Sequence, residues 1–423
     1  MKRCCLGWIA AAILLASIPC RAFGYPIDGY PFTGIRRLAR LQLIVKGELL
    51  GTVPAPGAQK PIEEIRLNLL QEKAAGLEPL PPVDPVLQKQ IDALFPDRHA
   101  SYGLALLDIT AGRSPRLALR QAERPLSPGS VGKLAIAAGL FRELAFLFPD
   151  DPEKRRDLLR SRTVVADKWI HTDHHEVPVF DPQTRSFASR PIREGDSFSL
   201  YEWADHMLSA SANAAASIVW KELLLMRRFG LEYPPSRGQE VDFFAKTPKE
   251  VLRDMAMAAV NDPLREAGIR QEDWQLGSFF TGAGKRVVPP GGSSYGTPLG
   301  LLRFLVALES GRVVDAWSSL ELKRLMYMTA RRIRYASSPA LTHAAVYFKS
   351  GSLYRCRPEP DFKCAKYMGN VENFMNSVAI IEHPDGRTYL VAIMSNVLRK
   401  NSAVEHQSLA TFIDRILAKP PAP

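Results

Sequence analysis

The chain has 423 residues, which allows two or three domains at roughly 150 residues per domain. Its 46% hydrophobic and 23% charged residues are typical of a globular protein and exclude a largely disordered or fibrous chain. The net charge is +11, and no internal stretch approaches the roughly 20 apolar residues that a membrane-spanning helix needs.

Residues 1–22 are predicted to be a secretory signal peptide. A basic start precedes the apolar run 4–17, and Ala22 supplies a small residue at the cleavage point. We therefore expect a secreted, periplasmic protein. Two alternatives stay open: an uncleaved anchor, and a lipoprotein that uses Cys20, although Pro19 fits poorly where a small residue is expected.

The charge of the exported chain is moderately basic. Cleavage removes three of the 55 basic residues and none of the 44 acidic ones, which leaves a net charge of +8. This excess would attract an anionic polymer or the surface of the cell envelope, but a solvated surface of mixed charge also explains it. Nucleic acid is not an expected partner, because the chain is exported and no nucleic-acid motif accompanies the charge.

Cleavage would leave two cysteines, Cys356 and Cys364. Two cysteines in an exported chain predict one disulfide, whose short loop would contribute roughly 2–3 kcal/mol. Their number excludes a zinc site built from paired CxxC motifs. The stretch 171–176, with sequence HTDHHE, lacks the HExxH spacing of a metal helix, so a solvated loop is predicted there. We expect no metal and no cofactor.

The N-terminal part of the chain is a proline-rich extension, residues 23–84. It carries two helical patterns, 34–45 and 62–75, and ends in a linker-like stretch, 80–83. The main domain is expected over 85–423. It begins with a helix that Asp84 would cap.

Apolar periodicity predicts the remaining elements. A polar insertion, 148–196, holds one β segment at 163–169. Two strands come before the helices and three after them, which predicts one sheet built from both ends of the domain. The strands are 101–110, 116–120, 345–353, 377–382 and 388–395, and the helices are 130–147, 200–208, 213–228, 298–310 and 402–417, the last burying Leu409, Phe412, Ile413, Ile416 and Leu417.

The first candidate motif is Ser130-Val131-Gly132-Lys133 at a helix start. A serine hydroxyl is a weak nucleophile near neutral pH and needs an adjacent base. Residues three apart share a helix face, so Lys133 can reach Ser130, and the helix start favours a developing anion. Taken alone, the tetrad is weak evidence, and Ser130 is better explained as a plain N-cap.

Two further motifs follow. Ser211-Ala212-Asn213 lies between two helices, where a hydroxyl and a carboxamide could relay a proton and bind a substrate amide. Capping by Ser211 or Asn213 is the alternative. Lys349-Ser350-Gly351 lies on a strand, where glycine permits close approach of a substrate backbone and lysine supplies a cation for a carboxylate.

In this order and on these elements, the three motifs resemble those of the class A β-lactamase and penicillin-binding-protein superfamily of active-site serine hydrolases. The resemblance covers roughly residues 85–420 and omits the extension and the insertion. It implies an α/β (α+β sandwich) fold, with an antiparallel sheet of about five strands flanked by helices and an all-helical subdomain.

The resemblance also implies roles. Ser130 would be the acylated nucleophile, Lys133 its general base and Ser211 a proton shuttle to the leaving nitrogen. The other implied roles are substrate binding by Asn213, carboxylate binding by Lys349 and Ser350, and an oxyanion hole from the N–H groups of Ser130 and Ser352, beside Gly351.

Two departures from the family pattern bear on the reaction. Position 212 is alanine where class A enzymes usually carry aspartate. Their Glu-x-x-Leu-Asn segment, whose glutamate activates the deacylating water, is missing between Asn213 and Lys349. Glu266 and Glu272 lie in that stretch without the pattern. The letters of 64–68 match it by chance, since they precede Ser130.

The sequence therefore predicts a monomeric, exported serine hydrolase that acts on C–N amide bonds of β-lactams or peptidoglycan-type peptides. A D,D-peptidase-type penicillin-binding protein with slow deacylation is one alternative. A non-catalytic envelope protein that keeps the pocket to bind a wall peptide is another.

Overall fold

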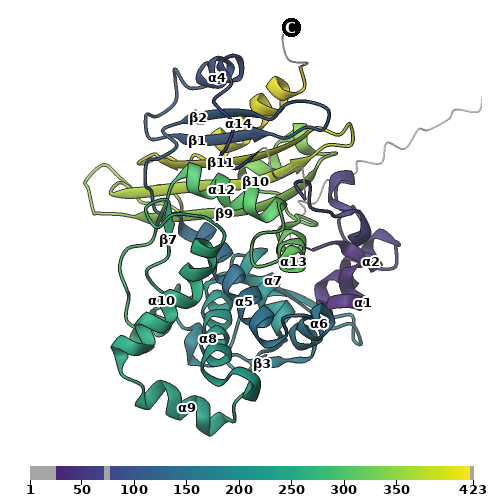
Figure 1. Cartoon of the computed structure of the whole chain (residues 1–423), viewed down its shortest axis with the longest axis vertical. Coiled ribbons are helices and arrows are strands. Elements are labelled where there is room, and N and C mark those ends of the chain that lie inside the picture. Colours follow the sequence, from purple (N-terminus) through teal and green to yellow (C-terminus); the bar gives the residue numbers. More distant parts are fainter. Residues whose placement is uncertain (1–24, 71–76, 420–423) are drawn as a thin grey trace, which may run out of the picture.

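The computed structural model describes residues 25–70 and 77–419 (Figure 1). The predicted signal peptide lies outside the described residues. The centre of the fold is a five-stranded antiparallel sheet in the order β2-β1-β11-β10-β9. Its strands are β1 (Gly103–Asp108), β2 (Arg116–Arg120), β9 (Ala345–Arg355), β10 (Glu372–Glu382) and β11 (Thr388–Asn396). Because β1 pairs with β11, the sheet is built from both ends of the domain, as predicted.

The sheet separates two hydrophobic cores. Leu104 and Leu106 of β1 join the core covered by α4 (Pro85–Asp92) and α14 (Ala403–Leu417). Ala105 and Leu107 face the larger core of the helical part. Alternate side chains of a strand point to opposite faces, so a strand with both faces covered must be apolar at every position.

A layer of helices fills the other side of the sheet (Figure 1). Its centre is α5 (Lys133–Leu147), which is buried along nearly its whole length. The predicted helices are confirmed as α7, α8 and α12, but α9, α10 and α13 were not predicted from the sequence. The bounds are α7 (Leu200–Leu208), α8 (Asn213–Phe229), α9 (Arg237–Lys246), α10 (Lys249–Glu266), α11 (Gly282–Val287), α12 (Pro298–Glu309) and α13 (Ala316–Met326), with a short pair β7 (Trp274–Gln275) and β8 (Tyr295–Gly296).

The insertion is more ordered than predicted. It begins with a helix, α6 (Pro152–Ser161), which buries only Arg155 and Leu159 and therefore leaves a weak apolar period. The predicted β segment is the short strand β3 (Thr163–Val165). It pairs with β6 (Ser197–Ser199), and the hairpin of β4 (Glu176–Phe180) and β5 (Phe187–Pro191) lies between them in the chain.

The extension contributes one of its two predicted helices. After the single turn α1 (Tyr30–Thr33), helix α2 (Arg36–Val45) matches the first pattern. The second prediction is wrong over its described part, because only the 3₁₀ turn Ile62–Glu64 is helical. The next backbone groups bond to the main domain instead: Asn68 N donates to Glu309 Oε2 at 2.6 Å.

Ion pairs bind the extension to the domain. Arg37 forms a bidentate, buried pair with Asp205 of α7, with both N–O distances 2.6 Å. Lys60 pairs with Glu382 of β10 at 2.8 Å. Breaking a buried pair by removing one partner typically costs 3–5 kcal/mol, so the extension is an integral part of the folded body.

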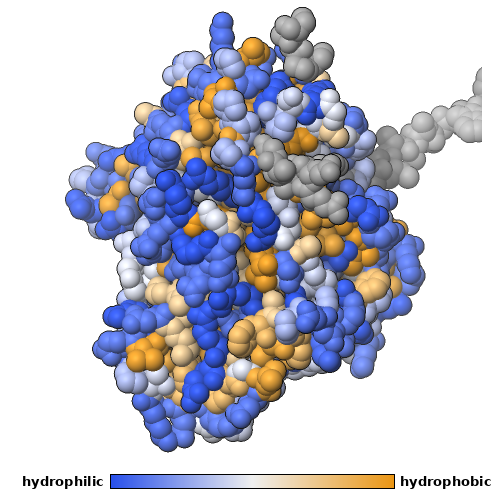
Figure 2. All heavy atoms as spheres, viewed as in Figure 1, coloured by the Kyte–Doolittle hydropathy of each residue, from blue (hydrophilic) through white to orange (hydrophobic). Residues whose placement is uncertain are grey.

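The closing helix and the surface complete the fold. Leu409, Ile413 and Leu417 of α14 are buried as predicted, whereas Phe412 is 40% exposed and Ile416 half-buried. Phe412 lies under the guanidinium of Arg98, so its ring covers a cation instead of the core. The surface of the described residues is mainly hydrophilic on the face shown in Figure 2, with scattered apolar patches. Among the described residues, no helix combines the length and apolar character needed to cross a bilayer.

Candidate active site

Ser130 and Lys133 lie where the chain, after leaving β2, enters the helical layer. Ser130 is in the 3₁₀ turn η4 (Gly129–Gly132), and Lys133 is the first residue of α5. The tight turn keeps both side chains on one face, with Lys133 Nζ 2.9 Å from Ser130 Oγ. Ser130 has no capping hydrogen bond to the helix, so the N-cap explanation of this serine does not apply.

The amine of Lys133 has three hydrogen-bond partners. Besides Ser130 Oγ, it contacts the backbone oxygen of Ser211 at 2.6 Å and Asn213 Oδ1 at 2.7 Å. Burial lowers the pKa of Lys133 to about 7, against a smaller opposing effect of Asp173. A neutral amine has two N–H donors and one lone pair. The two carbonyl oxygens take both donors, which directs the lone pair at the Ser130 hydroxyl.

The second motif connects α7 to α8. Ser211 has a φ of +60°, a left-handed conformation that is uncommon for a residue other than glycine. Its hydroxyl accepts a hydrogen bond from Lys349 Nζ at 2.8 Å. Asn213 is the first residue of α8, and the N-cap residue is Ala212. Neither Ser211 nor Asn213 therefore caps the helix, and both side chains face the lysines.

The third motif lies on β9, the edge strand of the sheet next to η4. A methyl group on Gly351 would collide with Pro128 O, and one on Gly129 would come within 2.7 Å of Ser352 N. Glycine at both positions is therefore required by the contact of the two backbones. This contact places the backbone of η4, which carries Ser130, beside the backbone of Ser352. Ser350 and Ser352 are half-buried on the strand.

Lys349 is buried among cations. Desolvation, and then the charges of Lys133 and Arg334, lower its pKa well below the ordinary value. Arg334 is buried too, and its Nη1 donates to Gly351 O at 2.6 Å. The run Arg331-Arg332-Ile333-Arg334 has the composition of a solvated helix end, but the chain turns Arg334 inward against β9. Nothing in the local pattern of charges marks this turn.

The stretch 171–176 was expected to be a solvated loop, and this is wrong for Asp173. Its side chain is 4% exposed, and its Oδ2 accepts a hydrogen bond from Ala214 N of α8 at 2.8 Å. A second residue that the sequence did not indicate is Phe280, whose ring centroid lies 4.8 Å from Lys133 Nζ. The described residues contain no group of three ligand-type side chains that could hold a metal ion.

The two glutamates considered for deacylation lie on the surface. Glu266 pairs with Arg142 at 2.7 Å and Glu272 with Arg270 at 3.2 Å, and both carboxylates are more than half exposed. In the described part of the chain, no carboxylate forms a hydrogen bond with Ser130, Lys133, Ser211 or Lys349.

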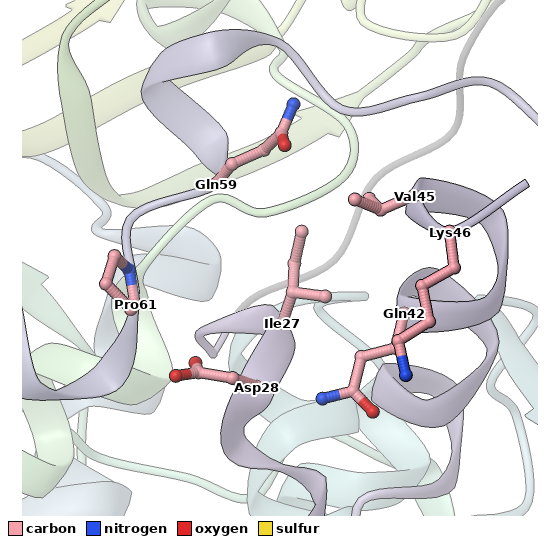
Figure 3. A pocket seen from close by; sticks show the side chains of 7 residues that line it. All are labelled: Ile27, Asp28, Gln42, Val45, Lys46, Gln59 and Pro61. Atoms are coloured by element: carbon pink, nitrogen blue, oxygen red, sulfur yellow. The ribbon is translucent and has the colours of Figure 1, made fainter.

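One cavity of the described structure lies away from these motifs. It measures about 220 Å³ and is lined by the extension alone (Figure 3). Its lining residues are Ile27, Asp28, Gln42, Val45, Lys46, Gln59 and Pro61. It therefore contributes nothing to the chemistry around Ser130.

The structure joins Cys356 and Cys364 in the predicted disulfide, with their Cα atoms 6.2 Å apart. The bridge lies in the loop between β9 and β10, and Tyr367 of the same loop stacks on the guanidinium of Arg334 at 4.9 Å. The loop therefore packs against Arg334, the residue that donates a hydrogen bond to Gly351 O.

We expect loss of this disulfide to have a modest effect. The Cys356→Ser/Cys364→Ser variant should melt at a lower temperature and acylate Ser130 less than about tenfold more slowly, because the bridge acts through Arg334 and not on the reacting atoms. Thermal melting and acylation rates of the two proteins test this. Complete loss of acylation in a folded variant would contradict it.

The sheet order, the Ser-Lys pair at the start of the buried helix and the lysine on the edge strand define the fold of β-lactamases and related penicillin-binding proteins. A family model described as "Beta-lactamase enzyme family" matches residues 86–416, and the chain belongs to this Beta-lactamase2 family. It is therefore a β-lactamase-like hydrolase, as the motifs led us to expect.

Solved structures agree with this fold. A β-lactamase from Chitinophaga pinensis DSM 2588 is 13% identical with a TM-score of 0.51, over 78% of this chain and 98% of that one. The TLA-3 extended-spectrum β-lactamase is 12% identical with a TM-score of 0.50, over 79% and 99%. At such identities the likeness concerns the fold alone. A search of curated proteins gives no significant match.

Proposed function

We propose that the protein is an exported serine hydrolase that forms an acyl-enzyme on Ser130 with β-lactams or peptidoglycan-type amides. The observation that carries the proposal is the position of Lys133 Nζ, 2.9 Å from Ser130 Oγ, with Ser211 O and Asn213 Oδ1 as its other two hydrogen-bond partners. A buried amine with a pKa of about 7 is a suitable general base near neutral pH.

The proposed reaction begins with attack of Ser130 Oγ on the substrate carbonyl carbon. The hydroxyl proton passes to Lys133 Nζ, and the N–H groups of Ser130 and Ser352 stabilise the oxyanion. The C–N bond then breaks, and the proton that Lys133 took from Ser130 reaches the leaving nitrogen through the Ser211 hydroxyl, which leaves Lys133 neutral and Ser211 protonated. Lys349 supports this relay, since its amine lies 2.8 Å from Ser211 Oγ. Water then adds to the ester and releases Ser130 with its proton.

The cations around β9 favour an anionic substrate. Lys349 and Arg334 are both buried, and no carboxylate forms an ion pair with either of them in the described ranges. A substrate carboxylate beside Lys349 would restore the charged form of this lysine, which burial disfavours. Both β-lactams and wall peptides carry such a carboxylate.

Export is part of the proposal. The predicted signal at 1–22 supports it, and so does the disulfide, because such bonds persist mainly in oxidising compartments. Within residues 25–70 and 77–419, no carboxylate forms a hydrogen bond with Ser130 or Lys133. This favours, as a second candidate, a penicillin-binding protein of the D,D-peptidase type that releases its acyl group slowly.

A fluorescent penicillin tests the proposal. We expect the wild-type protein to become covalently labelled and Ser130→Ala to remain unlabelled, because the variant lacks the nucleophile. The melting temperature of Ser130→Ala serves as the control for folding. A folded wild type that takes no label, or equal labelling of the variant, would contradict the proposal.

A further inference from the structure

Helix α8 begins without a cap of its own. The first N–H groups of a helix have no partner within the helix, and a side chain usually accepts one of them. The N-cap residue Ala212 offers only a methyl group. Asn213 Oδ1 is bonded to Lys133 and Ser211 Oγ to Lys349, so the polar side chains of the motif are engaged in the site.

Asp173 of the insertion supplies the missing acceptor. Its Oδ2 accepts from Ala214 N at 2.8 Å, the second residue of the helix, whose N–H a capping side chain commonly bonds. Its Oδ1 accepts from the backbone N–H groups of His174 at 2.9 Å and His175 at 3.2 Å. The ring Nδ1 of His175 lies 2.6 Å from the same oxygen.

The segment around Asp173 is held from two sides. Thr172 has a φ of +82°, which is strained for a β-branched residue, and its hydroxyl accepts from Gly282 N of α11 at 2.8 Å. Thr281 donates to Trp169 O at 2.8 Å and lies 2.9 Å from Ser217 Oγ of α8. Strain of this kind persists only where the surroundings fix it, so the carboxylate of Asp173 has a defined position.

Asp173 also affects the charge balance of the site. It is the carboxylate whose charge opposes the effect of burial on Lys133. The groups around these two residues are Lys349 and Arg334 on the side of β9, and His175 beside Asp173 itself. Asp173 is thus the negative charge facing a group of positive ones.

We propose that Asp173 is a positioning residue of the active site. It caps α8 from the insertion, which fixes Ser211 and Asn213 against the two lysines, and its charge sets the pH range in which Lys133 can act as a base. This rests on the proposed acylation of Ser130. The insertion then contributes, through Asp173, to the geometry and the charge of the active site.

Three variants separate the two effects of Asp173. Asp173→Asn keeps an oxygen for Ala214 N but removes the charge and the second acceptor, which now bonds His174 N and His175 N. We therefore expect a slightly lower melting temperature and a pH profile of acylation moved to lower pH by about half a unit or more. Asp173→Ala removes both, and should melt about 2 °C lower and acylate at least about tenfold more slowly. Adding Ala212→Asp to Asp173→Ala places a carboxylate at the N-cap itself, and should restore most of the rate and the stability.

Glu194→Gln is the matched control. It removes an exposed carboxylate of the same insertion that pairs with His171, and should leave rate, profile and melting temperature unchanged. A pH profile of Asp173→Asn equal to that of the wild type would overturn the electrostatic role. A rate and stability of Asp173→Ala that Ala212→Asp fails to restore would overturn the capping role. A wild type without label would instead refute the proposed function, and the melting temperatures would still decide whether Asp173 caps α8.

Discussion

Replacing Lys133 with arginine is expected to reduce the rate of Ser130 acylation by about 10²–10⁴-fold, the usual loss when a general base is removed. The reason is that Lys133 must be neutral to take the serine proton, and arginine stays protonated at all accessible pH values. The variant keeps a long cationic side chain beside Ser130, so the loss would reflect the missing lone pair.

The wild-type rate should follow the titration of Lys133. Burial lowers its pKa to about 7, so the charged form prevails below this pH and the neutral form above it. Acylation should therefore rise with pH through about 7 and then level off. Acylation rates of both proteins with a fluorescent penicillin, across this range, measure the effect.

Lys349→Arg is the matched control, because Lys349 is also buried but is proposed to act through its positive charge. This variant should retain far more acylation than Lys133→Arg. A Lys133→Arg protein that acylates at the wild-type rate would refute the assignment of Lys133 as the base.

The second large effect concerns release of the acyl group. Deacylation needs a water that is held and deprotonated beside the ester. The only carboxylate found to act on Lys133 within the described ranges is Asp173, which is engaged with the start of α8. The apolar ring of Phe280 lies 4.8 Å from the same amine. Loss of a general base costs about 10²–10⁴-fold, or roughly 3–5 kcal/mol of barrier.

We therefore expect a burst of one product per enzyme molecule with a penicillin, followed by weak turnover. Intact-protein mass spectrometry over time records both the rise of the acyl-enzyme and its decay. Glu266→Gln and Glu272→Gln should release the acyl group at the wild-type rate, since both carboxylates pair with surface arginines. Sustained hydrolysis at ordinary enzyme rates would contradict the prediction.

The sheet and the three motifs were predictable because both depend on local patterns. Strands with two buried faces, such as β1, are apolar throughout, and capped helices such as α12 carry Thr297 before their first turn. Each motif is too short to indicate a function alone, and their order along the chain is what indicates the family. The structure adds the 2.9 Å contact between Lys133 and Ser130, which the sequence alone does not show.

The residues that escaped prediction reach the site through long-range contacts. Arg334 and Asp173 each lie in a polar stretch whose composition is that of a solvated surface, and only the fold turns these two side chains inward. The helix α9 was missed for a related reason, since it buries only Phe243 and has little apolar period. Local pattern carries no information on which polar residue of a surface-like segment will meet a distant backbone group.

The pairing of the first strand with the last has a consequence for how the chain folds. Ser101 Oγ accepts from Asn396 N across 295 residues, and Tyr25 of the extension donates to Glu321 across 296. Contacts between residues so far apart in the sequence form slowly, because closing the long loop between them costs conformational entropy. A chain synthesised from its N-terminus therefore cannot close its central sheet until β11 has been made, so its unpaired strand edges stay open to aggregation during synthesis.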